Sequence, residues 1–549
     1  MRSSKLALLF ALTLFACARD ERAPMNEAVD ENKPQDGGTV VRRLESDIGT
    51  VNPILATSKY DRMIDNYIFT PMVYLDTNLR PVAGLAKSWD ITPDGRSYTF
   101  HLNEKATFSD GTPVLASDVY WTLTKIEDPS GGAAQLGGDF ENVDMAKTKV
   151  ADPHTIVISF KEPLAAQLVK FNDFNILPEH VYSKGDFKND YNIRAVGSGP
   201  YRLVKMDPQK EIVLERREDY WGQKPYLKTV VLKVMTDFVT AWNAIKKGDI
   251  DETNISSDVW MMESHRPENQ RKFDFRRFYT LSYNFVAWNE KNPLFQDKRV
   301  RRALGMCLDV PSIINNLYHG TARAMSGPFT PDEYAYNPAV PVLAYDPIGA
   351  KALFNNAGWF DTNNDGVLDK GGQPFKFDLY VFAGSSIGAQ FGQIFQSELK
   401  KVGVQMNIIQ LDPAQLLKHV ISGDYQSVYM GWQLDAEPDL YQTLHSTQTP
   451  PKGQNFVYYN NPVADQLMTQ ARAELDFAKR KALLQQLHAV LSADQPYSWT
   501  IQVSEKWVLS RRLHGVKVSS GYGLFTWYPG EFDWWIPRDE RVHDRPAGK

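Results

Sequence analysis

The sequence predicts an α/β fold built from several folding units. Its 549 residues exceed the size at which one hydrophobic core stops growing. Hydrophobic residues make up 43% and charged residues 23% of the chain, which is typical of globular domains and excludes a disordered or fibrous protein. From about residue 290 onward, strand patterns alternate with capped helices, which is the order of an α/β lobe.

The first seventeen residues have the pattern of an export signal. Arg2 and Lys5 precede an apolar stretch over residues 6–16, which is too short to span a bilayer comfortably. Cys17 follows in the sequence LFAC, which resembles the lipobox of bacterial lipoproteins, so we expect Cys17 to carry a lipid anchor. The alternative is an ordinary cleaved signal. Residues 18–37 are polar and predict a flexible tether.

The first half of the body shows short strands. Alternating apolar residues predict strands over 98–102, 155–160, 212–214 and 230–232, and the pattern over 116–124 predicts a helix. Cys307 falls at helical spacing among apolar residues and is expected to be a small buried side chain. No disulfide is expected.

The second half repeats one helix-starting device. Asp346-Pro347 and Asp412-Pro413 each place a capping acid before a proline that the first turn tolerates. The two helices should end at Gly358 and Gly423, with these side chains inward: Ile348, Leu353, Phe354, Leu416, Leu417, Val420 and Ile421.

Strand patterns over 404–408 and 428–432 flank the second of these helices, which predicts a βαβ unit. Asn461-Pro462 begins a long helical stretch through Leu491, and the aromatic tail over 521–537 predicts strands and turns.

Catalytic and cofactor motifs are not found in the sequence. Its ten histidines form no zinc pair, and phosphate loops and nucleophile elbows are missing, so we expect neither an enzyme nor a cofactor. Asp361, Asn363 and Asp365 open like a calcium loop, but position twelve is Gly372 instead of glutamate, which favours a hairpin turn. The net charge of −5 argues against nucleic acid as a partner.

Several longer motifs resemble one known family. AKSWDITPDGRSYTFHLNEKATFSDGTPVLASDVYW at 86–121 resembles the signature of the bacterial extracellular solute-binding proteins of family 5, the oligopeptide, dipeptide and nickel binding proteins of ABC importers. Five further stretches follow in collinear order: GSGPYRL at 197–203, DYWGQKPYL at 219–227, KKGDID at 246–251, FQDKRVRRALGMCLD at 295–309 and YDPIGAKALFNNAGW at 345–359.

The resemblance implies a two-lobed periplasmic binding protein with a hinge and an extra subdomain in the first lobe. Carried over, the lobe I core takes 38–66, 198–283 and 511–549, the extra subdomain takes 67–197, and lobe II takes 284–510. The chain would cross between the lobes near 281–283 and again near Ser510. Such a hinge closes on the ligand.

The resemblance also implies where a peptide would bind. In the family, a carboxylate beyond a strand that carries Trp receives the peptide α-amine, and Trp432 and Asp435 in GWQLDAEPD match it. The backbone of Gly431, Trp432 and Gln433 would pair with the peptide main chain. The facing strand of the first lobe would be Ser58, Lys59 and Tyr60.

Alternatives remain for these residues. The turn after Asp435 is one residue shorter than in peptide-binding relatives, so Asp439 is the reserve candidate. Asp435 could instead cap a helix, and Trp432 could belong to the core of the lobe.

The implied partners are a small peptide and an ABC permease with two membrane subunits and ATPases. We expect a monomer that contacts the membrane only through its lipid. The same family also leaves a nickel complex, haem, an oligosaccharide or an opine as ligand. A protein of another class, a ligand sensor that does not transport, is the second alternative.

Overall fold

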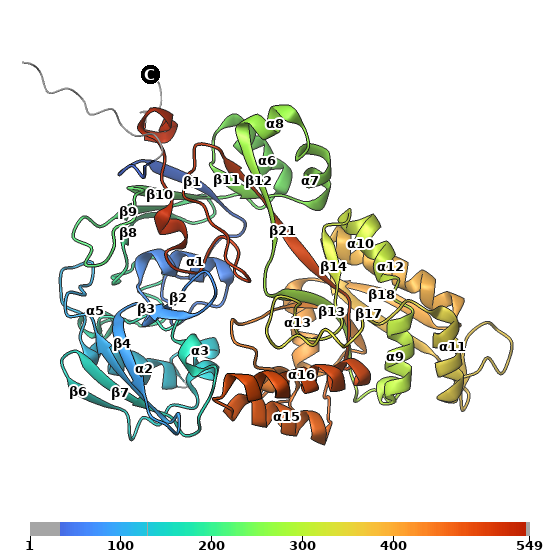
Figure 1. Cartoon of the computed structure of the whole chain (residues 1–549). Helices are drawn as coiled ribbons and strands as arrows, with labels where there is room; N and C mark the ends of the chain where they lie inside the picture. The colour runs from blue at the N-terminus through green and yellow to red at the C-terminus, as the bar shows by residue number, and fades with distance from the viewer. Residues whose placement is uncertain (1–32, 129, 545–549) are drawn as a thin grey trace, which may run out of the picture.

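The computed structural model describes residues 33–128 and 130–544. Figure 1 shows three regions: β1 and β8–β12 at the top, β4–β7 at the lower left, and β13, β17 and β18 at the right. The long strand β21 runs between the top and the right-hand region. The export signal, Cys17 and most of the expected tether lie outside the described residues. Within the described part, no helix is both long and apolar enough to cross a membrane.

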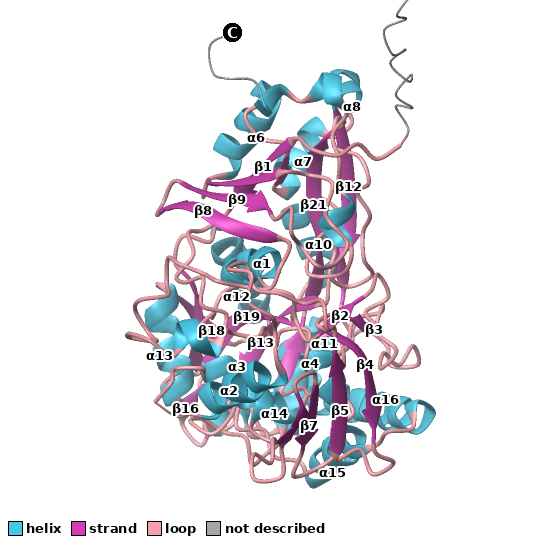
Figure 2. Cartoon of the chain, turned by 90° about the vertical axis from the view of Figure 1, so that its left-hand side faces the viewer, coloured by secondary structure: helices cyan, strands magenta, loops and turns pink. Residues whose placement is uncertain are grey.

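The first large sheet forms the core of lobe I. Its order is β12-β21-β11-β1-β10-β9-β8, with β14 added on β21. Strand β1 is parallel to β10 and β11, and the other pairs are antiparallel. Figure 2 shows β12 and β21 side by side along their length. The strands are β1 (Thr39–Leu44), β8 (Tyr201–Asp207), β9 (Glu211–Arg216), β10 (Thr229–Val234), β11 (Glu252–Asn254), β12 (Phe273–Tyr279), β14 (Ala322–Ala324) and β21 (Ile501–Ser510).

Three helices lie at one end of this sheet, at the top of Figure 1: α6 (Phe238–Lys247), α7 (Ser257–Glu263) and α8 (Pro267–Lys272). Trp242 and Ile245 of α6 pack with Phe273 of β12 and Val508 of β21 in one buried cluster. The predicted strands over 212–214 and 230–232 are confirmed as parts of β9 and β10.

The extra subdomain contains an antiparallel sheet of order β4-β5-β7-β6 and a small β2–β3 pair. Its strands are β2 (Val73–Leu75), β3 (Pro81–Ala83), β4 (Ala86–Ile91), β5 (Ser97–Leu102), β6 (Lys149–Asp152) and β7 (Thr155–Ser159). Its helices are α2 (Ala116–Glu127), α3 (Ala134–Phe140), α4 (Gln167–Lys170) and α5 (Glu179–Tyr182). The predicted strands over 98–102 and 155–160 and the helix over 116–124 are confirmed.

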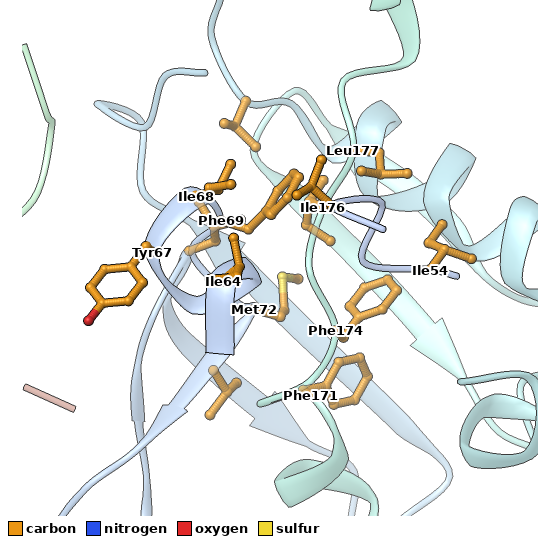
Figure 3. Close-up of a cluster of buried hydrophobic side chains, with 14 of the residues drawn as sticks. Ile54, Ile64, Tyr67, Ile68, Phe69, Met72, Phe171, Phe174, Ile176 and Leu177 are labelled. Carbon is orange, nitrogen blue, oxygen red and sulfur yellow. The ribbon is translucent and has the colours of Figure 1, made fainter. Parts of the chain in front are cut away.

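Helix α1 (Lys59–Ile68) joins this subdomain to the first sheet. Figure 3 shows its side chains Ile64 and Ile68 beside Phe171, Phe174 and Ile176 of the subdomain. These residues share one core, since the buried residues of the first sheet and of the subdomain form a single cluster.

The second large sheet belongs to lobe II. Its order is β18-β17-β19-β13-β20, with β17 parallel to both β18 and β19. The predicted βαβ unit is therefore confirmed, with α13 between β18 and β19. The strands are β13 (Ser282–Trp288), β17 (Lys376–Phe382), β18 (Gln405–Leu411), β19 (Ser427–Gln433) and β20 (Tyr497–Trp499).

Both faces of this sheet are covered by helices. Because successive side chains of a strand point to opposite faces, Val286 and Trp288 of β13 join one core cluster while Phe285 and Ala287 join another. The first cluster includes α9 (Lys298–Met306), α10 (Val310–Tyr318), α11 (Pro347–Asn356) and α12 (Ser386–Lys401). The second includes α13 (Pro413–Ser422), α14 (Tyr441–Leu444), α15 (Pro462–Ala473) and α16 (Phe477–Asp494).

The predicted helix caps are confirmed, but some of the side chains that were predicted to point inward are exposed. Asp346 and Asp412 accept hydrogen bonds from the backbone of Gly349 and Gln415, at 2.9 and 3.0 Å. The side chains of Leu416 and Val420 are buried, whereas Leu417 and Ile421 are each 51% exposed and Ile348 is 86% exposed. Successive helix residues differ by about 100° around the axis, so the neighbours of Leu416 and Val420 turn toward solvent.

Three smaller expectations have mixed outcomes. Cys307 is fully buried, as predicted. The long helical stretch that begins at Asn461 is two helices, because Asp476 caps a new helix at Phe477. The tail contains isolated bridges and a short 3-10 helix, η2 (Gly530–Asp533), instead of regular strands.

The carboxylate of Asp361 accepts N–H bonds from Asp365 and Gly366, at 3.1 and 3.0 Å. These bonds make residues 361–366 a local turn. The hairpin β15 (Asp369–Lys370) and β16 (Gln373–Pro374) follows it.

The chain passes twice between the two large sheets. Strand β12 ends at Tyr279 in the first sheet and β13 begins at Ser282 in the second. On the return, β20 ends at Trp499 in the second sheet and β21 begins at Ile501 in the first. Within β21, residues 501–503 pair with β14 and residues 504–510 pair with β12.

A buried arginine connects the parts of lobe I. Arg42 of β1 donates to Glu252 of β11 at 2.8 Å, and both side chains are fully buried. Its guanidinium also binds Tyr67 of α1, lies 3.4 Å from Glu531 of η2, and packs 4.1 Å from the ring centre of Phe525. One cation thus joins two strands, a helix and the C-terminal segment.

We expect Arg42→Met to lower the free energy of unfolding by about 3–5 kcal/mol, because it leaves buried carboxylates without their cation. Urea unfolding followed by tryptophan fluorescence measures it. The matched control is Arg202→Met on β8, whose partner Glu215 is on the surface of the same sheet, and it should cost less than about 1 kcal/mol. Equal losses in the two variants would contradict the role of Arg42.

Candidate functional site

A cleft lies where the first sheet, the extra subdomain and lobe II meet. It contains about 1230 Å³ of empty space, part of it open to solvent. Its walls come from α1, the segment 172–173, the end of β19, strand β21 and the segment 521–526. Its charged lining residues are Arg43, Glu45, Lys59, Arg62, Asp173, Asp435 and Glu505.

Residues 58–60 begin helix α1 instead of forming the expected strand. Ser58 accepts a bond from the backbone of Asp61 at 3.1 Å, and the Asp61 carboxylate accepts from the Ser58 backbone at 3.0 Å. This reciprocal capping box fixes the helix start, so the strand prediction was wrong. The sequence SKYD contains the signal, a serine followed three residues later by an acid. Lys59 and Tyr60 line the cleft, whereas the Ser58 hydroxyl is used by the cap.

The end of β19 offers an unpaired edge to the cleft. In the described residues, β17 pairs with β19 only at Ser427 and Val428. On the other side, β13 pairs with β19 up to Gln433, and the Leu434 N–H donates to Leu281 at 2.8 Å. Because backbone groups alternate in direction along a strand, those of Gly431 and Gln433 point away from β13.

The side chains of Trp432 and Gln433 on this strand make contacts within the protein. Trp432 packs near Phe285 and Phe456, with ring centres 6.2 and 5.9 Å away, and it does not line the cleft. The Gln433 amide donates to the Leu281 carbonyl at 2.8 Å. Gln433 is therefore the residue of β19 that lines the cleft, and the indole of Trp432 belongs to the core of lobe II.

Asp435 stands in the cleft without a basic partner among the described residues. Asp435 is an exposed residue, yet the surrounding protein atoms raise its pKa to about 6. Asp139, Asp173 and Asp439 raise this pKa further, and Lys170 opposes them. A carboxylate held in this way is suited to receive a cationic group.

The two other acids of this turn are already neutralised. Asp439 forms an ion pair with Arg472 at 3.0 Å, and Glu437 forms one with Arg480 at 2.9 Å. Neither lines the cleft. Asp435 is therefore better placed than the reserve candidate Asp439 to bind a cation.

Sequence reasoning missed several residues of the opposite wall. Glu505 and Trp507 alternate on β21, and burial raises the pKa of Glu505 while Lys59 lowers it. Tyr522 and Phe525 come from the C-terminal segment. The aromatic richness of that segment is visible in the sequence, but its position against β19 depends on the sheet topology.

Comparisons with known proteins agree with this architecture. Residues 80–455 match the family model described as bacterial extracellular solute-binding proteins, family 5 Middle. The chain belongs to this family. It is a solute-binding protein, and the match to the family model covers more than half of its length.

Two relatives cover most of this solute-binding protein. The oligopeptide-binding protein AppA of Bacillus subtilis is 27% identical over 97% of this chain and 98% of its own. Its solved structure, in complex with a nonapeptide, has a TM-score of 0.80 and covers 92% of this chain and 100% of that chain. The dipeptide-binding protein of Escherichia coli is 26% identical over 82% of this chain and 84% of its own.

A third structure shows that the fold alone does not select the ligand. NikZ of Campylobacter jejuni, in complex with Ni(L-His), has a TM-score of 0.79 and 24% identity over 92% of this chain and 100% of that chain. A two-lobed protein of this shape therefore occurs with a metal complex as well as with peptides. The class of ligand therefore depends on the residues that line the cleft.

The empty protein should be less stable with Asp435 ionised. Because its folded pKa, about 6, lies above the usual 3.8, this group favours the folded state below pH 3.8 and loses that contribution as pH rises to about 6. We therefore expect Asp435→Asn to keep or raise the melting temperature at pH 7, with a smaller difference at pH 4.

Asp439→Asn is the comparison variant, and it should lower the melting temperature because Arg472 loses its partner. Differential scanning calorimetry at both pH values measures these effects. A clear drop for Asp435→Asn at pH 7 would mean that Asp435 has a stabilising partner in the fold.

Proposed function

We propose that this solute-binding protein captures a peptide in the cleft between its lobes and delivers it to the permease of an ABC importer. The observation that carries the proposal is the unpaired end of β19, which leads to a carboxylate without a counter-charge. An extended main chain next to a free amine is the ligand that fits both features. The relationship to AppA, an oligopeptide-binding protein, supports it.

The bound peptide would lie as an added strand along Gly431–Gln433. Its α-ammonium would meet Asp435, and its chain would run past Lys59 and Tyr60 on α1. Backbone pairing reads no side chain, so it holds peptides of many sequences. A compact metal complex, oligosaccharide or haem would leave the strand edge unused, which makes these ligands less suitable. No catalytic step is part of the proposal.

The proposed domain division keeps the three parts expected from the sequence. The lobe I core would contain 38–66, 198–283 and 511–549, together with β21, which shares its sheet. The extra subdomain would be 67–197, and lobe II would run from 284 to about 500. We propose that the lobes close around the ligand and that the protein acts as a monomer beside a permease of two membrane subunits and ATPases.

Mass spectrometry of small molecules released from the purified protein by denaturation tests the ligand class. Peptides that start with a free amine are the expected result. Recovery of a metal complex, a sugar or haem in stoichiometric amount would exclude the peptide proposal.

Replacing Asp435 should weaken peptide binding strongly. Losing one partner of a closely enclosed charge pair costs about 2–5 kcal/mol. At about 1.4 kcal/mol per tenfold, Asp435→Asn should reduce affinity roughly thirtyfold or more. Titration calorimetry with the most abundant co-purified peptide and its N-acetylated form completes a double-mutant cycle.

The acetylated peptide should bind weakly to the wild type, and Asp435→Asn should weaken it little further. Asp424→Asn, with a carboxylate 82% exposed on lobe II, is the matched control and should leave affinity unchanged. Additive losses from acetylation and Asp435→Asn would show that Asp435 does not bind the amine.

We propose that Cys17 carries a lipid that anchors the protein at the cell envelope. Cys17→Ser should then move the protein from the membrane fraction to the soluble extracytoplasmic fraction, because the anchor is lost. Metabolic labelling with palmitate should mark the wild type and not the variant. If the wild type is not labelled, the protein is secreted after an ordinary signal cleavage and carries no lipid.

A further inference from the structure

A small side pocket lies next to the cleft, between α1 and the extra subdomain. Its polar lining residues include Arg62, Asp65, Asp139, Asp173 and Asn175. Arg62 and Asp173 line the cleft as well, so the two spaces share a wall. Figure 3 shows the apolar residues Ile64, Phe174 and Ile176, the chain neighbours of Asp65 and Asn175. These apolar chain neighbours of Asp65 and Asn175 are part of the hydrophobic core.

Two buried acceptors of the side pocket have no donor. Asp65 is 1% exposed and Asn175 is 6% exposed. Among the described residues, neither the Oδ1 atom of Asp65 nor that of Asn175 has a hydrogen-bond partner. Unmatched buried acceptors are costly, so this pocket favours an occupant that brings N–H groups.

The charges around the side pocket are also unbalanced. Asp139 pairs with Lys170 at 2.8 Å, and Asp173 lies 3.8 Å from Arg62. Asp65 has no such ion pair in the described structure, and neither does Asp435 across the shared wall. If Asp435 binds the α-ammonium of a peptide, Asp65 could pair with a second positive charge of the same ligand.

Burial raises the pKa of Asp65 well above its usual value, and the carboxylates of Asp61 and Asp173 add to the effect while Arg62 opposes it. A nearby cation would restore the ionised form. Within the described residues, no group of three or more His, Cys, Asp or Glu could hold a metal ion. An ammonium or guanidinium group is thus the cation that suits this pocket, since its N–H groups also satisfy the free acceptors.

We propose that the side pocket binds the cationic side chain of the first residue of the peptide, so that the protein prefers peptides beginning with Lys or Arg. This inference rests on the proposed function. The first residue is assigned because Asp173 lines both the side pocket and the cleft, and the cleft also contains Asp435, where the α-amine is placed. Side chains of later residues would lead away along β19.

Titration calorimetry with three tetrapeptides tests the preference: Lys-Ala-Ala-Ala, norleucine-Ala-Ala-Ala and Ala-Lys-Ala-Ala. Norleucine keeps the carbon chain of lysine but lacks its ammonium. We expect the lysine-first peptide to bind about tenfold tighter or more than each of the other two, the effect of one hydrogen bond to a charged group.

Two variants link the preference to the side pocket. Asp65→Asn and Asp173→Asn should each reduce the ratio of affinities for the lysine-first and norleucine-first peptides. Using Asp173→Asn, whose side chain is 46% exposed, keeps the test valid if Asp65→Asn folds poorly. Asp90→Asn, an 82% exposed position of the same subdomain, is the matched control and should keep the wild-type ratio.

Each other outcome contradicts the inference in a recognisable way. Equal binding of lysine-first and norleucine-first peptides, with both bound, removes the subsite and leaves peptide capture intact. A gain from lysine at the second position removes the assignment to the first residue. An equal gain when butylammonium is added to the norleucine peptide indicates a site for free amines. No binding of any tetrapeptide, with a non-peptide ligand recovered from the purified protein, would instead overturn the proposed function.

Discussion

The buried guanidinium of Arg42 fixes the lobe I wall of the cleft. It binds Glu252 on the neighbouring strand, Tyr67 on α1 and Glu531 near the C-terminus, segments that are far apart in sequence. The same helix α1 carries Lys59 and Tyr60 into the cleft, and the same C-terminal segment carries Phe525. A buried charge tolerates little displacement of its partners, because each lost contact leaves a desolvated charge. The position of these cleft residues therefore depends on an interaction that lies behind the cleft and does not touch a ligand.

The lobe II wall depends on how strands end. Strand β19 continues beyond its pairing with β17, and in the described part of the chain its last residues are paired only with β13. At the same place, Leu281 accepts the Leu434 N–H and donates its own N–H to Gly521, both at 2.8 Å. The end of β19, the crossing between the sheets and the C-terminal segment are thus joined by backbone bonds. An unpaired edge is ordinarily a liability for a protein, and here its end at Gln433 lines the cleft.

Much of this architecture could be predicted from local signals. Asp346 and Asp412, each followed by a proline, predict the starts of their helices, and apolar residues at every second position predict β18 and β19. The start of α1 carries an equally local signal in Ser58 and Asp61, which the expected strand overlooked. Too many residues of α13 were predicted to be buried, because helix propensity does not indicate how much of the helix surface the sheet covers. Pairs such as Asp65 with Asn175, or Asp139 with Asp435, could not be predicted, because they are brought together by segments more than a hundred residues apart.

The distribution of charge also relates ligand binding to the arrangement of the lobes. Asp139 and Asp173 belong to the extra subdomain and Asp435 to lobe II, and their carboxylates repel one another across the cleft. Among the described residues, two hydrogen bonds connect these parts: the Ala165 N–H donates to the Arg472 carbonyl at 3.0 Å, and the Gln442 amide donates to Glu141 at 3.2 Å. Because Asp139 pairs with Lys170 and Asp173 lies 3.8 Å from Arg62, Asp435 is the carboxylate of these three that has no ion pair in the described structure. In the proposed function, a cationic group beside Asp435 would be attracted by the carboxylates of both parts, so it would favour the arrangement in which these parts lie close together. Such a difference in affinity between two arrangements is what a ligand needs to shift a hinge equilibrium.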